Sequence, residues 1–100
     1  MKFKLIKIKE GKEAIWEEWC AKVQNEFYNE ALVSIQEEKV LQETVAKVEI
    51  NNRLYCFIII DGDCLPANMG REINKIHAQK KEECIESIDT VEVLYNIKQK

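Results

Sequence analysis

The longest apolar run in the chain lies in the stretch Leu-Tyr-Cys-Phe-Ile-Ile-Ile-Asp, residues 54–61. Turn-forming residues bound it on both sides, with Asn51-Asn52 before it and Asp61-Gly62-Asp63 around its end. A strand that exposes one face to water alternates polar and apolar residues, and this run does not. It therefore predicts a strand buried on both faces. This constrains the fold strongly, because something must cover each side of the strand.

The length and composition predict one soluble domain spanning residues 1–100. A net charge of −3 and a pI of about 5.3 give no electrostatic reason to expect nucleic acid or anionic lipid as a partner. No apolar run reaches the roughly 20 residues of a membrane span, and the lysines of residues 2–9 interrupt any signal-peptide core. We therefore expect a cytoplasmic protein whose four cysteines are free thiols.

The spacing of apolar residues predicts the order of the elements. Residues 2–9 alternate lysine with apolar residues, as a strand does, and residues 12–38 carry apolar side chains at three- and four-residue spacing, typical of one long helix or of two helices broken near 25–29. Residues 40–50 and 53–61 predict a hairpin, because asparagine tolerates the positive φ of a two-residue turn. A loop over 61–70, a helix over 71–87 and a strand over 90–98 complete the chain.

This βαββαβ order predicts an α+β, ferredoxin-like domain with a four-stranded antiparallel sheet and its helices on one face. The helices can cover only one side of the sheet, yet the central strand is apolar on both. A second copy of the chain would cover the other side. We therefore expect a homodimer that packs sheet against sheet.

A two-residue turn also fixes which residues of the hairpin lie opposite one another. Val48 should face Tyr55, and Glu43 should face Ile60. We assign the face that carries Tyr55, Phe57 and Ile59 to the helices. The other face should form the dimer interface, with its candidates Glu43, Lys47, Cys56, Ile58 and Ile60.

Several segments along the chain resemble one family of small, uncharacterised prokaryotic proteins, namely Lys9-Glu10-Gly11-Lys12-Glu13, Leu41-Gln42-Glu43-Thr44-Val45, Arg53-Leu54-Tyr55, Ile73-Asn74-Lys75-Ile76-His77, Glu82-Glu83-Cys84 and Val91-Glu92-Val93-Leu94-Tyr95. That family of unknown function is similar in fold to the dimeric α/β-barrel group, which includes antibiotic-biosynthesis-type monooxygenases. The resemblance implies a homodimer with a cavity between helices and sheet, and it brings no established activity. The chain departs from the family pattern in a short loop after Asp61 and in Asn74, where the pattern has an aspartate.

His77 is the only histidine, and it belongs to the apolar stripe of the last predicted helix. Its ordinary pKa makes it the natural proton carrier, although a histidine at such a position is also often a structural hydrogen-bonding group. The assigned faces predict a ligand pocket formed by Tyr55, Phe57, His77, Trp16, Trp19 and Cys84. The two tryptophans have the alternative of being ordinary core residues.

Glu43 is the second candidate, because a carboxylate opposite an apolar residue needs a partner. The assigned faces separate it from His77, so we expect no His77–Glu43 dyad within one subunit and a lysine across the dimer as its partner. No two of the cysteines and His77 have a short chelating spacing, so we predict no metal site. Asp61-Gly62-Asp63 has the composition of a turn.

Two readings of function follow. We expect a homodimer that binds a small apolar ligand without a cofactor, and the enzymatic alternative is a cofactor-free oxygenase or isomerase in which His77 moves protons and Tyr55 orients the substrate. RNA-recognition domains share the βαββαβ order, and Arg53-Leu54-Tyr55-Cys56-Phe57-Ile58 faintly resembles their base-stacking strand. The glycines of that motif are missing and the chain is acidic, which disfavours RNA.

Overall fold

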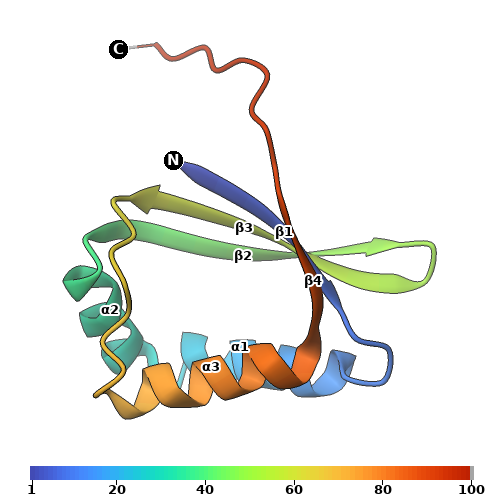
Figure 1. The fold of residues 1–100 in the computed structure, drawn as a ribbon, viewed down its shortest axis with the longest axis horizontal. Coiled ribbons are helices and arrows are strands. Elements are labelled where there is room, and N and C mark those ends of the chain that lie inside the picture. The colour runs from blue at the N-terminus through green and yellow to red at the C-terminus, as the bar shows by residue number, and fades with distance from the viewer. Residues whose placement is uncertain (100) are drawn as a thin grey trace.

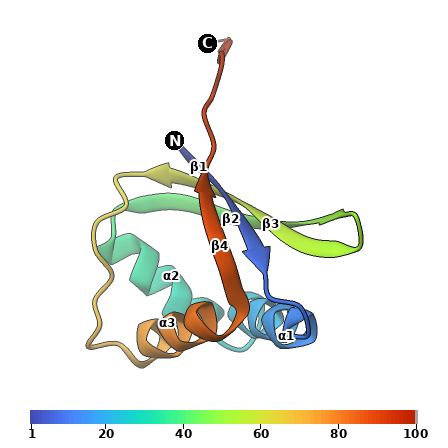
Figure 2. The same cartoon turned by 45° about the vertical axis from the view of Figure 1, so that its right-hand side comes forward.

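A computed structural model describes residues 1–99. The elements in chain order are β1 (Lys2–Ile8), α1 (Glu13–Gln24), α2 (Tyr28–Glu37), β2 (Val40–Ile50), β3 (Arg53–Gly62), α3 (Glu72–Cys84) and β4 (Ile85–Thr90). The strands form one antiparallel sheet in the order β2-β3-β1-β4, and the three helices lie on one side of it (Figures 1 and 2). The predicted α+β, ferredoxin-like class is confirmed.

The region from residue 12 to residue 38 forms two helices. Helix α1 ends at Gln24, and the backbone N–H and the side-chain Nδ2 of the next residue, Asn25, both donate to the carbonyl oxygen of Ala21, at 3.1 and 2.8 Å. Phe27 then packs its ring 5.9 Å from that of Trp19 before α2 begins. Residues 12–38 thus form two helices and not one, and Asn25 supplies hydrogen bonds to a backbone carbonyl in the last turn of the first.

The hairpin has the register that the sequence predicts. Asn51 and Asn52 both have positive φ, 51° and 63°, which is the backbone of a type I′ turn. Glu43 pairs with Ile60, and Val48 pairs with Tyr55.

The assignment of the two faces, however, is wrong. The core beneath the helices consists of Ile6, Ile8, Trp16, Trp19, Leu54, Cys56, Ile73 and Cys84. Tyr55 and Phe57 lie on the opposite face, where the rings of Phe57 and Phe3 are 5.9 Å apart. A register states which residues share a face, but the side that meets the helices depends on tertiary packing. The polar residues that suggested an interface belong to β2, an edge strand that is exposed beyond Val40.

The predicted interface residues are therefore corrected as well. Cys56 and Ile60 are buried on the helix side of the sheet, and Ile58 packs against the same core. Lys47 pairs with Glu17 of α1 in its own chain at 2.8 Å. None of these side chains is available to a sheet-to-sheet contact.

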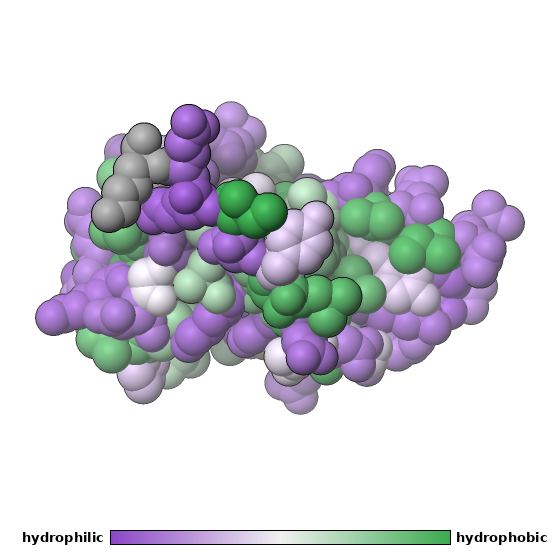
Figure 3. All heavy atoms as spheres, turned by 90° about the horizontal axis from the view of Figure 1, so that it is seen from above, coloured by the Kyte–Doolittle hydropathy of each residue, from purple (hydrophilic) through white to green (hydrophobic). Residues whose placement is uncertain are grey.

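No helix among residues 1–99 covers the outer face of the sheet (Figures 1 and 2). Seen from above, apolar and aromatic side chains gather near the middle of this side of the molecule, over which residues 91–99 also extend, with polar side chains around them (Figures 1 and 3). By the strand pairing, the outer face carries Phe3, Leu5, Thr44, Ala46, Val48, Tyr55, Phe57 and Ile59. The expectation that the central strand is apolar on both sides therefore holds.

The last strand is shorter and earlier than the predicted 90–98. Helix α3 ends at Cys84 and β4 follows at once from Ile85, so the pairing with β1 is complete near Phe3, whose carbonyl oxygen accepts the Val91 N–H at 3.3 Å. Residues 91–99 extend beyond the sheet without further strand structure (Figure 1). Their apolar side chains are exposed: Leu94, Tyr95 and Ile97 are 79–87% accessible.

Candidate ligand-binding cavity

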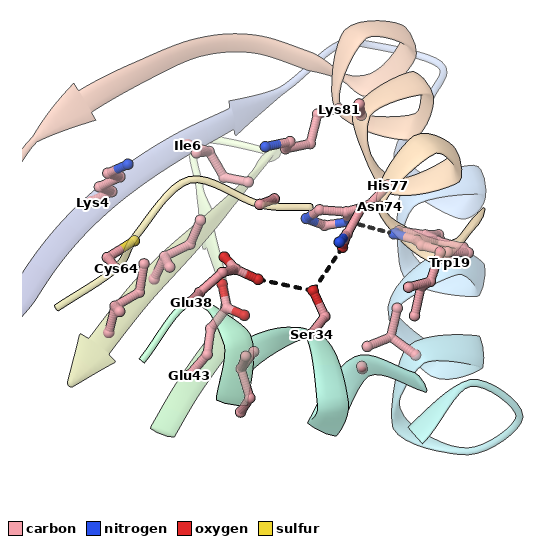
Figure 4. A pocket seen from close by; sticks show the side chains of 18 of the residues that line it. Lys4, Ile6, Trp19, Ser34, Glu38, Glu43, Cys64, Asn74, His77 and Lys81 are labelled. Atoms are coloured by element: carbon pink, nitrogen blue, oxygen red, sulfur yellow. Dashed lines mark hydrogen bonds between the residues drawn. The ribbon is translucent and has the colours of Figure 1, made fainter. Parts of the chain in front are cut away.

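A cavity of about 260 Å³ lies between the helices and the helix-facing side of the sheet. Its walls are mainly apolar, from residues that include Ile6, Ile35, Ile58, Ile60, Ile73 and Ala78. Polar side chains also point into it from several elements (Figure 4). They are Lys4, Ser34, Glu38, Glu43, Asn74, His77 and Lys81. The cavity thus combines an apolar body with a compact set of polar groups.

His77 lines the cavity from α3, and its protonation state follows from its partner. The indole Nε1–H of Trp19 donates to His77 Nδ1 at 2.9 Å, so Nδ1 is an acceptor and the proton of the neutral ring is on Nε2. Burial, and secondarily the charge of Lys81, lower the pKa of His77 to about 4. At neutral pH His77 is therefore an uncharged ring whose Nε2–H can donate toward the cavity (Figure 4).

Glu43 reaches the cavity from β2. Much of this residue is exposed at the sheet edge, but its carboxyl group turns inward and lines the cavity (Figure 4). Burial raises the pKa of Glu43 and the nearby charge of Glu38 raises it further, while Lys81 and Lys4 oppose the shift. Glu43 and His77 thus share one cavity, which the face assignment excluded.

Ser34 joins three parts of the cavity wall. It is only 4% exposed, and its Oγ lies 2.9 Å from Glu38 Oε2 and 2.9 Å from Asn74 Oδ1. Because the hydroxyl has one hydrogen, it donates to one of these oxygens at a time. Asn74 Nδ2 donates in turn to the carbonyl oxygen of Asn68 at 2.9 Å, so the network connects α2, α3 and the loop between β3 and α3.

The sequence singled out neither Ser34 nor Glu38. One available signal was the spacing of Asn74, which is three residues before His77 and therefore on the same side of the helix. Ser34 also lies one helical turn after Ala31 in the apolar stripe of α2, where a buried hydroxyl needs a partner.

The predicted pocket residues divide into three groups. His77 and Trp19 line the cavity. Trp16 and Cys84 are buried in the adjoining core, and Tyr55 and Phe57 are on the outer face of the sheet. Three residues that the sequence assigned to the dimer interface line the cavity instead: Glu43, Ile58 and Ile60.

Three of the four cysteines, Cys20, Cys56 and Cys84, are not activated as nucleophiles. Burial raises the pKa of Cys84 and Cys56, and it raises the pKa of Cys20 to about 11, so all three remain thiols at neutral pH. All four cysteines are unpaired. Among residues 1–99, no group of three acidic, histidine or cysteine side chains has the arrangement of a metal site.

The whole described chain, residues 1–99, matches the profile of one protein family, described only as a family of unknown function, DUF6176. The chain belongs to this family. No curated protein and no solved structure matches it. In the part of this DUF6176 protein that the structure describes, none of the helices is long and apolar enough to cross a membrane.

Proposed function

We propose that this DUF6176 protein binds a small, largely apolar and uncharged molecule in the cavity between its helices and its sheet. The observation that carries the proposal is the cavity itself, whose apolar walls enclose a hydrogen-bond donor held in place by a second side chain. Its volume of about 260 Å³ is below the roughly 300–1,000 Å³ that is usual for drug-sized ligands, so the ligand is smaller than those.

The charges around the cavity favour a ligand without net charge. Lys4 and Lys81 are balanced by Glu38 and Glu43, so neither an anion nor a cation gains a net electrostatic attraction. A carbonyl or ether oxygen on the ligand would accept the Nε2–H of His77. The rest of the molecule would be held by the apolar walls.

Binding can be tested with small fragments of different charge: cyclohexanone, benzoate and benzylamine. Trp19 lines the cavity, so NMR of the indole N–H signals reports occupancy. We expect a saturable shift with cyclohexanone and much weaker effects with the two ions. Native mass spectrometry of the purified protein would then search for a ligand that is carried along.

A cavity-filling pair of variants provides the control. Ala78→Phe places a ring in the cavity and should abolish the shift, whereas Ala21→Phe adds the same ring at an exposed position of α1 and should not. Absence of a saturable shift with every fragment in the wild-type protein would contradict the proposed function.

We further propose that the protein acts as a cytoplasmic homodimer. The outer face of the sheet supports this, because no helix among residues 1–99 covers its aromatic and aliphatic side chains. The exposed apolar side chains of residues 91–99 give a second reason. Contiguous apolar surface of this kind is typical of an interaction site. The unpaired cysteines fit a reducing compartment.

A cofactor-free oxygenase or isomerase is the second candidate, and the cavity changes the role that His77 would have in it. With Nδ1 engaged by Trp19 and with a lowered pKa, His77 is suited to donate a hydrogen bond rather than to accept a proton. Tyr55 is on the outer face of the sheet and cannot orient a ligand in this cavity.

A further inference from the structure

Two groups with complementary chemistry face the same cavity from different elements. The carboxyl group of Glu43 enters from β2, and the imidazole of His77 enters from α3 (Figure 4). A molecule that fills the space between them would contact a base on one side and an N–H donor on the other. Apolar residues such as Ile60 and Ile73 form part of the wall around them.

The orientation of His77 is fixed before any ligand arrives. The Trp19 N–H holds Nδ1 at 2.9 Å and thereby keeps the proton on Nε2. The Nε2–H of a neutral imidazole held in this way can donate a hydrogen bond to an oxygen that gains negative charge, and the imidazole keeps its proton. A pre-oriented donor of this kind is more effective than water, because it needs no reorganisation when the charge develops.

Glu43 has the features of a carboxylate base. Burial of the carboxyl group and the nearby charge of Glu38 raise the pKa of Glu43, which makes its ionised form a stronger base, while Lys81 and Lys4 oppose that shift. The titratable groups that line the cavity with it are Lys4 from β1, Glu38 directly after α2, Cys64 from the loop after β3, and His77 and Lys81 from α3. A carboxylate base opposite a neutral imidazole is a known arrangement for proton transfer next to a carbonyl group.

We propose that the cavity catalyses a proton shift in a small, apolar carbonyl compound, with Glu43 as the base and His77 as the donor to the carbonyl oxygen. The inference rests on the proposed function, because the substrate must occupy the same cavity. A β,γ-unsaturated ketone has the required chemistry. It has no charge, it is small, and the proton between its carbonyl and its double bond is acidic.

The step balances without an oxidant or a metal. The Glu43 carboxylate takes the α-proton, the C–H electron pair becomes a carbon–carbon double bond, and the carbonyl π pair moves to oxygen. The resulting dienolate oxygen accepts the hydrogen bond from His77 Nε2–H. Glu43 then returns the proton to the γ-carbon, which gives the conjugated ketone and restores the carboxylate.

The probe for the test is 3-cyclohexenone, whose conversion to 2-cyclohexenone is followed by ultraviolet absorbance, with NMR in D₂O to locate the transferred hydrogen. We expect saturable turnover above the buffer rate. Glu43→Gln should lower kcat by about 100-fold or more, and His77→Phe by about 10- to 100-fold, with KM changed by less than about threefold. Glu30→Gln, an exposed residue of α2, is the control and should keep the wild-type rate.

The pH profile supplies a readout that a structural role would not give. The rate should rise with pH as Glu43 ionises and then level off, and this rise should be absent in Glu43→Gln. Cyclohexanone binding is measured in parallel on the same variants. Binding without turnover, or a Glu43→Gln variant with the wild-type rate, would overturn the catalytic inference and leave the binding proposal standing. Failure of cyclohexanone and 3-cyclohexenone to bind would overturn both.

Discussion

Burial shifts the pKa values of Glu43 and His77, which line the same cavity, in opposite directions. It disfavours the charged form of each, so the pKa of the base His77 falls to about 4 while the pKa of the acid Glu43 rises. At neutral pH His77 is therefore uncharged, and ionising Glu43 costs more free energy in the folded chain than in the unfolded chain.

The lowered pKa of His77 predicts that acid weakens the fold. Between the unfolded value of about 6.5 and the folded value of about 4, only the unfolded chain takes up the proton, so stability is complete above this window and is lost as the pH falls through it. By pH 4.5 the loss from this group should reach about 2 to 3 kcal/mol. In His77→Phe, the free energy of unfolding measured with urea should therefore fall by about 2 to 3 kcal/mol less between pH 7.5 and pH 4.5 than in the wild-type protein.

The raised pKa of Glu43 predicts the opposite behaviour. Below its unfolded pKa both states are protonated, and as the pH rises the unfolded chain ionises first, so the folded state loses stability. Glu43→Gln should therefore raise the free energy of unfolding at pH 7.5, by less than about 1 kcal/mol because the residue is partly exposed and water screens its charge. The gain should disappear near pH 4. An equal gain at both pH values, or a gain in the exposed control Glu30→Gln, would contradict this explanation.

At this scale the sequence located His77 but not its surroundings. Periodicity placed His77 on the buried stripe of its helix, and α3 bears that out. The Ser34–Asn74 contact joins residues that are 40 positions apart, and only tertiary packing brings them together. Glu43 was missed as a cavity residue because the register shows which residues of β2 share a face of the sheet but not which face meets the helices.

Among the elements, the hairpin shows what local chemistry determines. Asn51-Asn52 fixed the turn, and the turn fixed every pair from Ile50–Arg53 to Glu43–Ile60. Register has period two, so it leaves two equivalent ways to place the faces. The prediction of a last strand over residues 90–98 was wrong for a similar reason. The length of β4 depends on where its partner strand β1 begins, which the sequence of β4 does not encode.

Gly62, at the end of β3, packs closely against the backbone of Lys39 and Val40, which lies between Glu38 and Glu43 in the chain. It closes β3 with a φ of +130°, and a Cβ at this position would lie 2.7 Å from Val40 Cα and would clash with the Lys39 carbonyl oxygen. Backbone atoms cannot move aside easily, and the φ itself is unfavourable for other residues. Gly62→Ala should therefore cost about 3 kcal/mol or more in urea unfolding.

Gly11 provides the matched comparison for that substitution. Its φ of +89° is also positive, but a Cβ there would meet nothing within 4 Å. Gly11→Ala should cost only about 1–2 kcal/mol, from backbone strain alone. If the two alanine variants lose the same stability, the close approach to Lys39 and Val40 contributes nothing.

For the whole molecule, the order of elements and the apolar central strand followed from the sequence, because periodicity and turn residues encode them locally. The outer face has aromatic and aliphatic residues on β1, β2 and β3 that no helix among residues 1–99 covers. Residues 91–99, whose apolar side chains are exposed, extend from the sheet on this side (Figures 1 and 3). A second copy of the chain is the simplest cover for both, since a symmetric contact buries the same face twice.

Light scattering coupled to size exclusion should therefore give the mass of two chains of 11.7 kDa each. Phe57→Lys places a charge in the middle of the outer face and should produce monomers, because an unpaired charge buried between two sheets is costly. Leu32→Lys is the control, since Leu32 is a 39% exposed leucine of α2 on the helical side and its replacement should leave the dimer intact. A wild-type protein that elutes with the mass of one chain at concentrations well above micromolar would refute the dimer, and the outer face would then require a different partner.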